Sequence, residues 1–212
     1  MTIANTPSPS HGVRLRRLSR WQAETLREDL ADLYVESSRA RPRREYDGRE
    51  GFLRRLTGDM RRPGFALLVG EDTAFVGCVY GFPVRREGAW WRGFVGALPR
   101  SVEQLTESGH VFAIAETLVH PRTMDRNLAR RLHERLLADH HATLGATLVD
   151  RTDSTAFDAF LSWGWQDIGH VRRPSHPASP RPSAPEVLRA LVLPLGPHTA
   201  TGRPDGSSTS PG

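Results

Sequence analysis

A run of nearly uninterrupted apolar residues, Val111 to Val119, constrains the fold of this chain more than any other feature. Such a run is typical of a central strand that is covered on both faces of its sheet. Pro121 ends the run, and leucines then recur at the spacing of one helix face, at Leu128, Leu132, Leu136 and Leu137. A buried strand that leads into an amphipathic helix indicates an α/β domain.

The remaining patterns extend this α/β prediction to one mixed central sheet of about six to seven strands flanked by about four helices. We expect strands at 13–18, 65–69, 74–82, 111–119, 146–149, 166–172 and 187–195. Ser19 and Gln22 form a capping-box signature for a first helix, and further helices are expected from Asp47 to Met60, from 128 to about 140 and from Asp153 or Ser154 to Gly164. No regular pattern appears between Gly96 and Gly109.

The 212 residues suit one domain with tails. We expect a loose arm at 1–12, a single domain at 13–195 with a Pro-rich loop at 174–186, and a disordered tail at 196–212. The N-terminus lacks the apolar stretch of a signal peptide, and no run is long enough to cross a membrane. A cytoplasmic location is therefore the default expectation.

Residue usage excludes several kinds of chemistry. The chain has one cysteine, Cys78, so an internal disulfide and a cysteine-rich zinc site are excluded. All 29 basic residues are arginine, which excludes a Walker-type phosphate loop and a lysine Schiff base. Arginine, alanine and proline usage suggests a GC-rich bacterial source. Because the arginines are mixed with acids and the net charge is only +5, a solvated surface is favoured over a nucleic-acid footprint.

Glu116 is an unusual residue for a buried strand, because an unpaired buried carboxylate is costly. Strand alternation places it on one face with Phe112, Ile114 and Leu118. It can be a general base whose pKa is raised by desolvation. It can equally be paired with one of the many arginines or exposed at the strand end.

The loop that follows, Pro121 to Arg130, leads straight into the leucine-striped helix. A helix N-terminus offers unpaired backbone N–H groups and a positive dipole end, which suit a pyrophosphate. Arg122, Arg126 and Arg130 could add charge there. The alternative is an ordinary strand-to-helix connection with solvated arginines.

These segments resemble the GNAT superfamily of N-acetyltransferases, in which a Glu-x-x-Val-x-Pro-like strand end precedes a phosphate loop of the form Arg/Gln-x-x-Gly-x-Gly/Ala. The first is matched by Glu116, Val119 and Pro121, and the loop falls on Met124 to Ala129. The family's later Asn-x-x-Ala-x-x-x-Tyr helix corresponds to Asp153, Ala156 and Phe160, and its Gly-Phe ending to Gly164-Trp165. With the helices and hairpin before it, the resemblance spans about 13–195.

The resemblance implies transfer of an acetyl group from acetyl-CoA, or of another acyl group, to the amine of a small molecule, with Glu116 as general base. It implies that the cofactor contacts Leu118, Val119, Met124, Asp125, Arg126, Asn127, Leu128, Ala129, Arg130, Asp153 and Phe160. Four positions depart from the family pattern. Met124 replaces Arg/Gln, Asp125 adds a negative charge, Asn127 replaces the glycine and is the next best residue for a left-handed conformation, and Phe160 replaces the proton-donating tyrosine.

Other residues offer weaker signals. Trp90 and Trp91 could wall an acceptor pocket or simply pack in the core. His133, His140 and His141 lack the pattern of a metal site, so no metal is expected. The alternative function is a GNAT-fold protein of specialised metabolism that has lost or altered acetyl-CoA use. Antibiotic resistance or biosynthesis is the expected setting, with the chain a monomer or homodimer.

Overall fold

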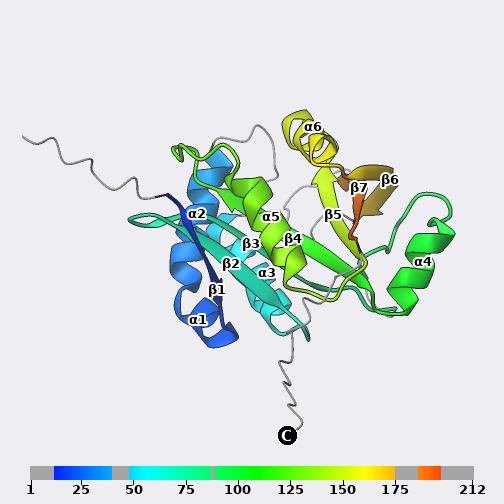
Figure 1. Ribbon diagram of the computed structural model, residues 1–212, viewed down its shortest axis with the longest axis horizontal. Coiled ribbons are helices and arrows are strands. Elements are labelled where there is room, and N and C mark those ends of the chain that lie inside the picture. The colour runs from blue at the N-terminus through cyan, green and yellow to red at the C-terminus, as the bar shows by residue number, and fades with distance from the viewer. Residues whose placement is uncertain (1–11, 40–47, 87–88, 175–185, 197–212) are drawn as a thin grey trace, which may run out of the picture.

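Seven strands form one sheet in the order β1-β2-β3-β4-β5-β7-β6 (Figure 1). The computed structural model describes residues 12–39, 48–86, 89–174 and 186–196. The strands are β1 Arg14–Leu18, β2 Ala66–Glu71, β3 Phe75–Pro83, β4 Val111–Val119, β5 Leu144–Asp150, β6 Gln166–Arg173 and β7 Glu186–Pro194. The helices are α1 Arg20–Thr25, α2 Arg27–Arg39, α3 Gly48–Met60, α4 Arg100–Glu107, α5 Leu128–Ala138 and α6 Ser154–Ser162. The expected mixed α/β sheet is confirmed.

The pairing of β4 with β5 is the one parallel contact of the sheet, and it is short. It runs from Val111 opposite Leu144 to Ile114 opposite Thr147 and ends there. β4 continues to Val119 and β5 continues to Asp150, and Figure 1 shows the two strands diverging beyond their common start. No described strand lies between their carboxyl ends.

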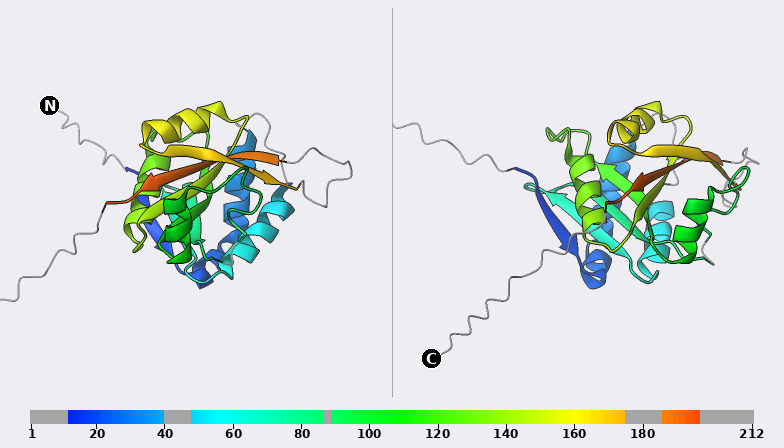
Figure 2. Two further views of the ribbon diagram at one scale, coloured as in Figure 1. Left: turned by 90° about the vertical axis from the view of Figure 1, so that its right-hand side faces the viewer. Right: turned by 45° about the vertical axis from the view of Figure 1, so that its right-hand side comes forward.

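Helices cover both faces of the sheet (Figures 1 and 2). On one face, α1, α2 and α3 bury a cluster that includes Leu30, Tyr34, Phe52 and Leu56 against β2, β3 and β4. On the other face, the leucine stripe of α5 packs with α6 against Leu68, Val79, Phe112 and Ile114. Because helices cover both faces of the sheet, both faces of β4 are buried, which explains why β4 is apolar almost throughout.

A β-bulge at Ala115 changes which face the end of β4 presents. Tyr80 pairs with Glu116, but the next residue of β3, Gly81, pairs with Ile114, so Ala115 is the extra residue. Ile114 therefore lies in the cluster with α5, whereas Leu118 lies in the cluster with α2 and α3. The expectation that Glu116 shares a face with Phe112 and Ile114 is wrong, because the bulge reverses the alternation between them.

Most predicted elements are confirmed, with two helices added. The Ser19–Gln22 capping box is present, with Ser19 Oγ accepting from the Gln22 N–H and Gln22 Oε1 accepting from the Ser19 N–H. The first predicted helix is two helices, α1 and α2, with Leu26 between them. The helix α4 was not predicted. Together with the division into α1 and α2, it brings the expected four helices to six in the described part of the chain. The predicted cap at Asp47 and nearly all of the arm, the tail and the Pro-rich loop lie outside the described residues. None of the described helices is long and apolar enough to cross a membrane.

Substitution at Gly81 tests the close strand approach at the bulge. A Cβ atom there would lie 2.0 Å from the Ala113 carbonyl oxygen and 2.7 Å from Phe112 Cε1. We expect Gly81→Ala to lower the free energy of unfolding by about 1–3 kcal/mol, measured by urea denaturation. Gly58→Ala is the matched control, because its Cβ would meet nothing within 4 Å. That helical change should stabilise the protein by about 0.5–1 kcal/mol. Equal stabilities of Gly81→Ala and the wild type would contradict the bulge geometry.

Candidate active site

A cavity of about 870 Å³ lies where β4 and β5 diverge, on the sheet face covered by α3. Ala115 and Glu116 of β4 bound it on one side, and Leu148 and Asp150 of β5 bound it on the other. Its wall is completed by α2 and α3, by the end of β3, and by parts of the 89–92 segment, β6 and β7. The two helices, the turn after α3 and β3 contribute Tyr34, Arg55, Asp59, Arg62, Tyr80 and Phe82. The 89–92 segment and β6 contribute Trp90, Arg92, Arg172 and Arg173. The cavity thus joins the strand opening to a polar, arginine-rich wall.

Glu116 is the acidic residue at the strand opening, and it is only 5% exposed. The bulge at Ala115 turns its side chain toward Tyr80, its partner across the strands. Arg55 of α3 is its ion-pair partner, with 3.8 Å between Arg55 Nη2 and Glu116 Oε2. The pairing with an arginine that the sequence allowed is therefore present, and the carboxylate is not exposed at the strand end.

The groups around Glu116 keep fixed charges. Burial lowers the pKa of Arg55, but the Glu116 carboxylate and a hydrogen bond with Tyr34 outweigh it, so its pKa is raised overall. Burial and then the Glu116 charge raise the pKa of the Tyr80 phenol well above its usual value. Tyr80 is therefore a protonated, neutral phenol beside Glu116, and Arg55 is a permanent cation.

Asp59 and Arg62 form a second charged pair on the cavity wall. Arg62 Nε donates to Asp59 Oδ1 at 2.9 Å, and its guanidinium lies 4.3 Å from the centroid of the Phe82 ring. Burial raises the pKa of Asp59 more strongly than Arg62 lowers it. Arg55 and Asp59 occupy one flank of the helix whose Phe52, Leu56 and Met60 face the core.

The loop before α5 places a carboxylate at the helix N-terminus. Asp125 Oδ1 accepts from the Asn127 N–H at 3.0 Å, and the other oxygen of the same carboxylate pairs with Arg131. The Leu128 N–H donates to the Asp125 carbonyl. The backbone N–H groups of Ala129 and Arg130 have no acceptor among the described residues, and they form the open part of this terminus.

Asn127 does not adopt the left-handed conformation that its position suggested. Its φ is −98°, and its side chain makes no capping hydrogen bond. The Asp125 carboxylate organises the turn instead, so no positive φ is needed. Met124 projects into solvent with 93% of its side chain exposed. Arg126 is also exposed, and Arg130 pairs with Glu134 at 2.7 Å.

On the α5 side of the strand opening, aromatic residues surround a buried histidine. His133 Nε2 lies 2.7 Å from Thr117 Oγ1, while its Nδ1 has no partner among the described residues. Its ring contacts Phe160, Trp163 and Trp165 at centroid distances of 5.2, 5.6 and 6.0 Å. Phe160, expected near the cofactor, is thus a buried member of this cluster.

Other expected site residues have structural contacts of their own. Asp153 caps α6, because its Oδ1 accepts from the Ala156 N–H at 2.9 Å. The Leu128 side chain is fully buried, so only its backbone is available to a ligand. Leu118 is buried in the α2–α3 cluster and Val119 packs against the α5 cluster. Both lie on the part of β4 that has no β5 partner.

The two adjacent tryptophans have different positions. Trp90 lines the cavity and packs edge-on against Phe82 with 5.9 Å between ring centroids. Trp91 is not among the residues lining the cavity. Its indole donates to Thr106 Oγ1 of α4 at 3.0 Å, which holds α4 to the irregular segment.

Sequence reasoning missed Arg55, Tyr80 and Arg173 as cavity residues. The position of Arg55 could have been inferred from the sequence, because Arg55 lies beside the predicted buried face of its helix, formed by Phe52, Leu56 and Met60. For Tyr80 and Arg173, only the sheet pairing brings them to the cavity, since they lie on β3 and β6.

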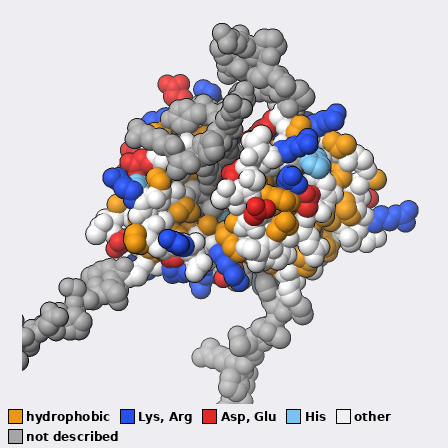
Figure 3. Space-filling view, turned by 90° about the horizontal axis from the view of Figure 1, so that it is seen from above, with side chains coloured by type: hydrophobic (Ala, Val, Ile, Leu, Met, Phe, Trp, Pro, Cys, Tyr) orange, Lys and Arg blue, Asp and Glu red, His pale blue; other side chains and the backbone are white. Residues whose placement is uncertain are grey.

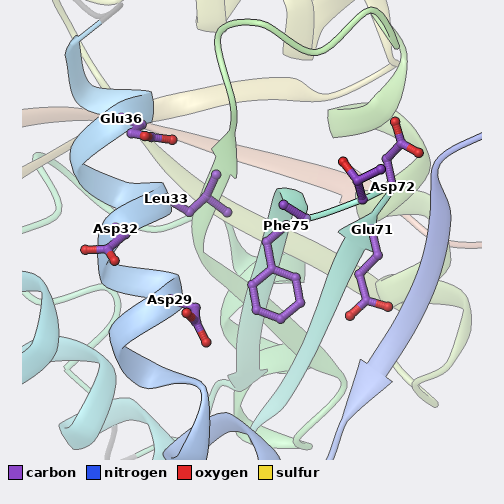
Figure 4. A pocket seen from close by; sticks show the side chains of 9 residues that line it. Asp29, Asp32, Leu33, Glu36, Glu71, Asp72 and Phe75 are labelled. Carbon is purple, nitrogen blue, oxygen red and sulfur yellow. The ribbon is translucent and has the colours of Figure 1, made fainter.

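A smaller depression of about 430 Å³ lies between α2 and the β2–β3 hairpin (Figure 4). Figure 4 shows the carboxylates of Asp29, Asp32 and Glu36 on α2 opposite Glu71 and Asp72 on the hairpin. Asp32 pairs with Arg49 and Glu71 with Arg16, and Glu36 Oε2 lies 2.7 Å from His120 Nε2. No group of three potential metal ligands occurs in the described part of the chain.

The surface of the described residues shows mixed charge rather than one basic face in the view from above (Figure 3). Blue and red side chains are interspersed there with hydrophobic ones. This view agrees with the expectation of a solvated, mixed surface from the sequence.

The buried His133 predicts a specific loss of stability in acid. Burial lowers its pKa from 6.5 to about 3, so the unfolded chain binds a proton at a higher pH than the folded protein does. The free energy of unfolding should therefore fall as pH drops from about 6.5 to about 3, by up to about 1.4 kcal/mol per pH unit from this residue. Urea denaturation across this range should show a shallower pH dependence for His133→Leu. Thr117→Val is the control, because it removes the hydrogen bond and keeps the imidazole. An unchanged slope in His133→Leu would overturn this prediction.

Comparison with known proteins identifies the architecture. No family model matches the sequence, and no curated protein matches it significantly. Solved structures do match in fold. A GNAT-family acetyltransferase from Streptococcus pneumoniae is 12% identical, with 87% of this chain and 100% of that chain covered and a TM-score of 0.56.

Two further structures agree with it. An acetyltransferase from Thermus thermophilus is 15% identical, with 86% of this chain and 97% of that chain covered and a TM-score of 0.57. A putative acetyltransferase from Salmonella typhimurium, solved with its cofactor acetyl-CoA, is 16% identical, with 89% of this chain and 96% of that chain covered and a TM-score of 0.55. Together with the diverging β4 and β5 strands, these matches assign the chain to the GNAT acetyltransferase fold.

Proposed function

We propose that this protein is an acyl-CoA-dependent N-acyltransferase that acetylates an amine of a small molecule. The observation that supports this most is the cavity between the diverging ends of β4 and β5, with Glu116 at its edge. The fold match to acetyltransferases, one of them solved with acetyl-CoA, supports the same reaction class.

In this proposal Glu116 is the general base. Its carboxylate takes a proton from the acceptor amine, directly or through a water, so that the nitrogen lone pair is free to attack. Arg55 pairs with the carboxylate, with 3.8 Å between Arg55 Nη2 and Glu116 Oε2, and so helps to hold it in place. Tyr80 is neutral beside it and can hold the amine by a hydrogen bond.

Several features fit the CoA part of the cofactor. The open N–H groups of Ala129 and Arg130, with Arg122 and Arg126 nearby in sequence, suit the pyrophosphate. The stretch of β4 at Leu118 and Val119, which has no β5 partner, suits the amide-bearing arm. Acetyl-CoA supplies an acyl thioester, whose carbon–sulfur bond breaks as the amine nitrogen bonds to the acyl carbon.

No general acid is required at Phe160 in this mechanism. Phenylalanine has no proton to donate, and Phe160 is buried among His133, Trp163 and Trp165. A thiol has a pKa of about 8.5, so a thiolate can leave and then take a proton from water. The aromatic cluster then serves to exclude water from one side of the opening.

A second candidate function rests on Asp125. Its carboxylate already accepts from the Asn127 N–H and pairs with Arg131, so part of the helix terminus is occupied by the protein's own anion. This favours a GNAT-fold protein that has lost or altered its use of acetyl-CoA. Titration with the cofactor separates the two candidates.

Calorimetric titration with acetyl-CoA and free CoA tests the proposal directly. We expect saturable binding of both, and thiol release when a suitable amine is added. Glu116→Gln should lower kcat by about 100-fold or more while the acetyl-CoA Kd changes little, because the base acts in the transition state. Asp150→Asn is the control, since its carboxylate is held by Thr152. No binding at millimolar ligand would reject the acyl-CoA proposal and support the second candidate.

The charge of Asp125 should weaken cofactor binding. Asp125→Asn removes a negative charge from the α5 N-terminus and releases Arg131 from its ion pair. We expect CoA to bind about 3–5-fold more tightly, which corresponds to about 1 kcal/mol at a helix terminus. Asp139→Asn, at the opposite end of the same helix, is the matched control. Unchanged affinity in Asp125→Asn would show that the pyrophosphate binds elsewhere.

A further inference from the structure

The cavity wall carries an excess of positive charge. Among the described residues that line it, seven are arginines and four are carboxylates. Asp59 pairs with Arg62, Glu116 pairs with Arg55, and Asp150 accepts from the Thr152 hydroxyl and backbone N–H. Glu186 lies opposite Arg173 in the β6–β7 pairing and acts on it electrostatically. The acidic groups are therefore already engaged, and the excess charge is left to the arginines.

Five of the lining arginines form no salt bridge with any described residue. They are Arg54, Arg85, Arg92, Arg172 and Arg173. Arg86, the neighbour of Arg85, differs from them because it does not line the cavity and pairs with Glu107 at 3.4 Å. Guanidinium groups that line a cavity and form no salt bridge there are suited to an external anion, since each can donate two parallel hydrogen bonds.

The fold brings these arginines together from distant parts of the chain. The segment containing Arg92 is attached to the edge of β6, because the Arg172 N–H donates to the Gly93 carbonyl at 2.8 Å and the Val95 N–H donates to the His170 carbonyl at 2.8 Å. A Cβ atom at Gly93 would lie 2.0 Å from the Arg172 carbonyl oxygen, and its φ is +84°. Glycine at this position thus lets the segment that carries Arg92 approach the backbone of Arg172 closely.

Arg173 is the most constrained of the five. Its guanidinium lies 5.6 Å from the centroid of the Trp90 ring, and Trp90 is itself held edge-on by Phe82 and Trp91. Burial lowers the pKa of Arg173, with Glu186 acting in the opposite direction. A partly desolvated guanidinium held over an aromatic face keeps its N–H edges available and gains most from an anionic partner.

We infer that the acceptor carries an acidic group, a carboxylate or a phosphate, which the arginines around Trp90 bind while its amine lies at Glu116. This inference rests on the proposed acyl transfer for the role of Glu116. It makes Arg173 and Arg92 specificity-determining residues, which bind the acceptor and take no part in the proton transfer. Polyamines and other polycations are excluded as preferred acceptors by like-charge repulsion.

Matched pairs of amines test the inference in a thiol-release assay with acetyl-CoA. The pairs are γ-aminobutyrate and n-butylamine, phosphoethanolamine and ethanolamine, and 4-(aminomethyl)benzoate and benzylamine, with spermidine as the polycation. We expect kcat/KM to be about 10-fold or more higher for the acidic member of a pair, which corresponds to about 1.4 kcal/mol. The carboxylate and phosphate pairs distinguish the two anion types. Equal or better turnover of the amines that lack an acidic group, or of spermidine, would overturn the inference.

Variants of the cavity arginines test whether these residues cause the preference for acidic amines. Arg173→Gln and Arg92→Gln should raise KM for the acidic amines about 10-fold while kcat changes little, so that the preference is lost. Arg86→Gln, outside the cavity and paired with Glu107, should leave the preference intact. A preference that survives in both cavity variants would show that other groups recognise the acceptor.

A separate binding measurement decides the charge preference if no amine is acetylated. Calorimetry of the full chain with phosphoethanolamine and 4-(aminomethyl)benzoate, without acetyl-CoA, should show saturable binding that weakens in Arg173→Gln and at higher salt. Absence of that binding would reject the inference by itself. Binding of the anions together with absence of CoA binding would reject only the acyl transfer.

Discussion

Four residue pairs join the two halves of this sheet. Among the described residues, strands β1 to β4 pair with strands β5 to β7 only where Val111 to Ile114 run beside Leu144 to Thr147. The parallel ladder is short because β4 and β5 diverge after it (Figure 1). Everything proposed for the site depends on this divergence, since it leaves strand edges without a strand partner and opens a space at the sheet centre.

The bulge at Ala115 decides which side of the sheet receives Glu116. In an unbroken strand, Glu116 would share the face of Phe112 and Ile114, beneath α5. The extra residue turns it toward Arg55 and Tyr80 instead. The close approach of Gly81 to the Ala113 carbonyl shows why β3 has no side chain at this point. A glycine on one strand and a small bulged residue on the other thus position the carboxylate.

The two sides of the opening have contrasting character. The α5 side is filled by aromatic rings around a neutral, fully buried imidazole, His133. The α3 side is polar, with ion pairs at Glu116 and Asp59 and further arginines along the wall. In the proposed reaction, the charged acceptor binds on the α3 side, where the cavity lies. The apolar surroundings on the α5 side lower the local dielectric constant, which strengthens the charge interactions between the acceptor and the cavity wall.

The N-terminus of α5 shows how departures from a family pattern can compensate one another. Asn127 stands where a glycine is usual, yet its backbone is not left-handed. The Asp125 side chain holds the turn by accepting from the Asn127 N–H, and Arg131 balances its charge. Both departures are visible in the sequence, but their connection through one carboxylate is visible only in the structure.

By itself the sequence determined the elements with strong local patterns. The apolar run of β4, the leucine stripe of α5 and the Ser19 cap are local signals, and each predicted its element. The eight residues of α4 are too few to show a helical period and were missed. Only the tertiary structure decided the face of Glu116, because a bulge depends on the register with β3. It alone also brought Arg55, Arg92 and Arg173 to one cavity, since their proximity comes from packing and sheet pairing across long stretches of chain.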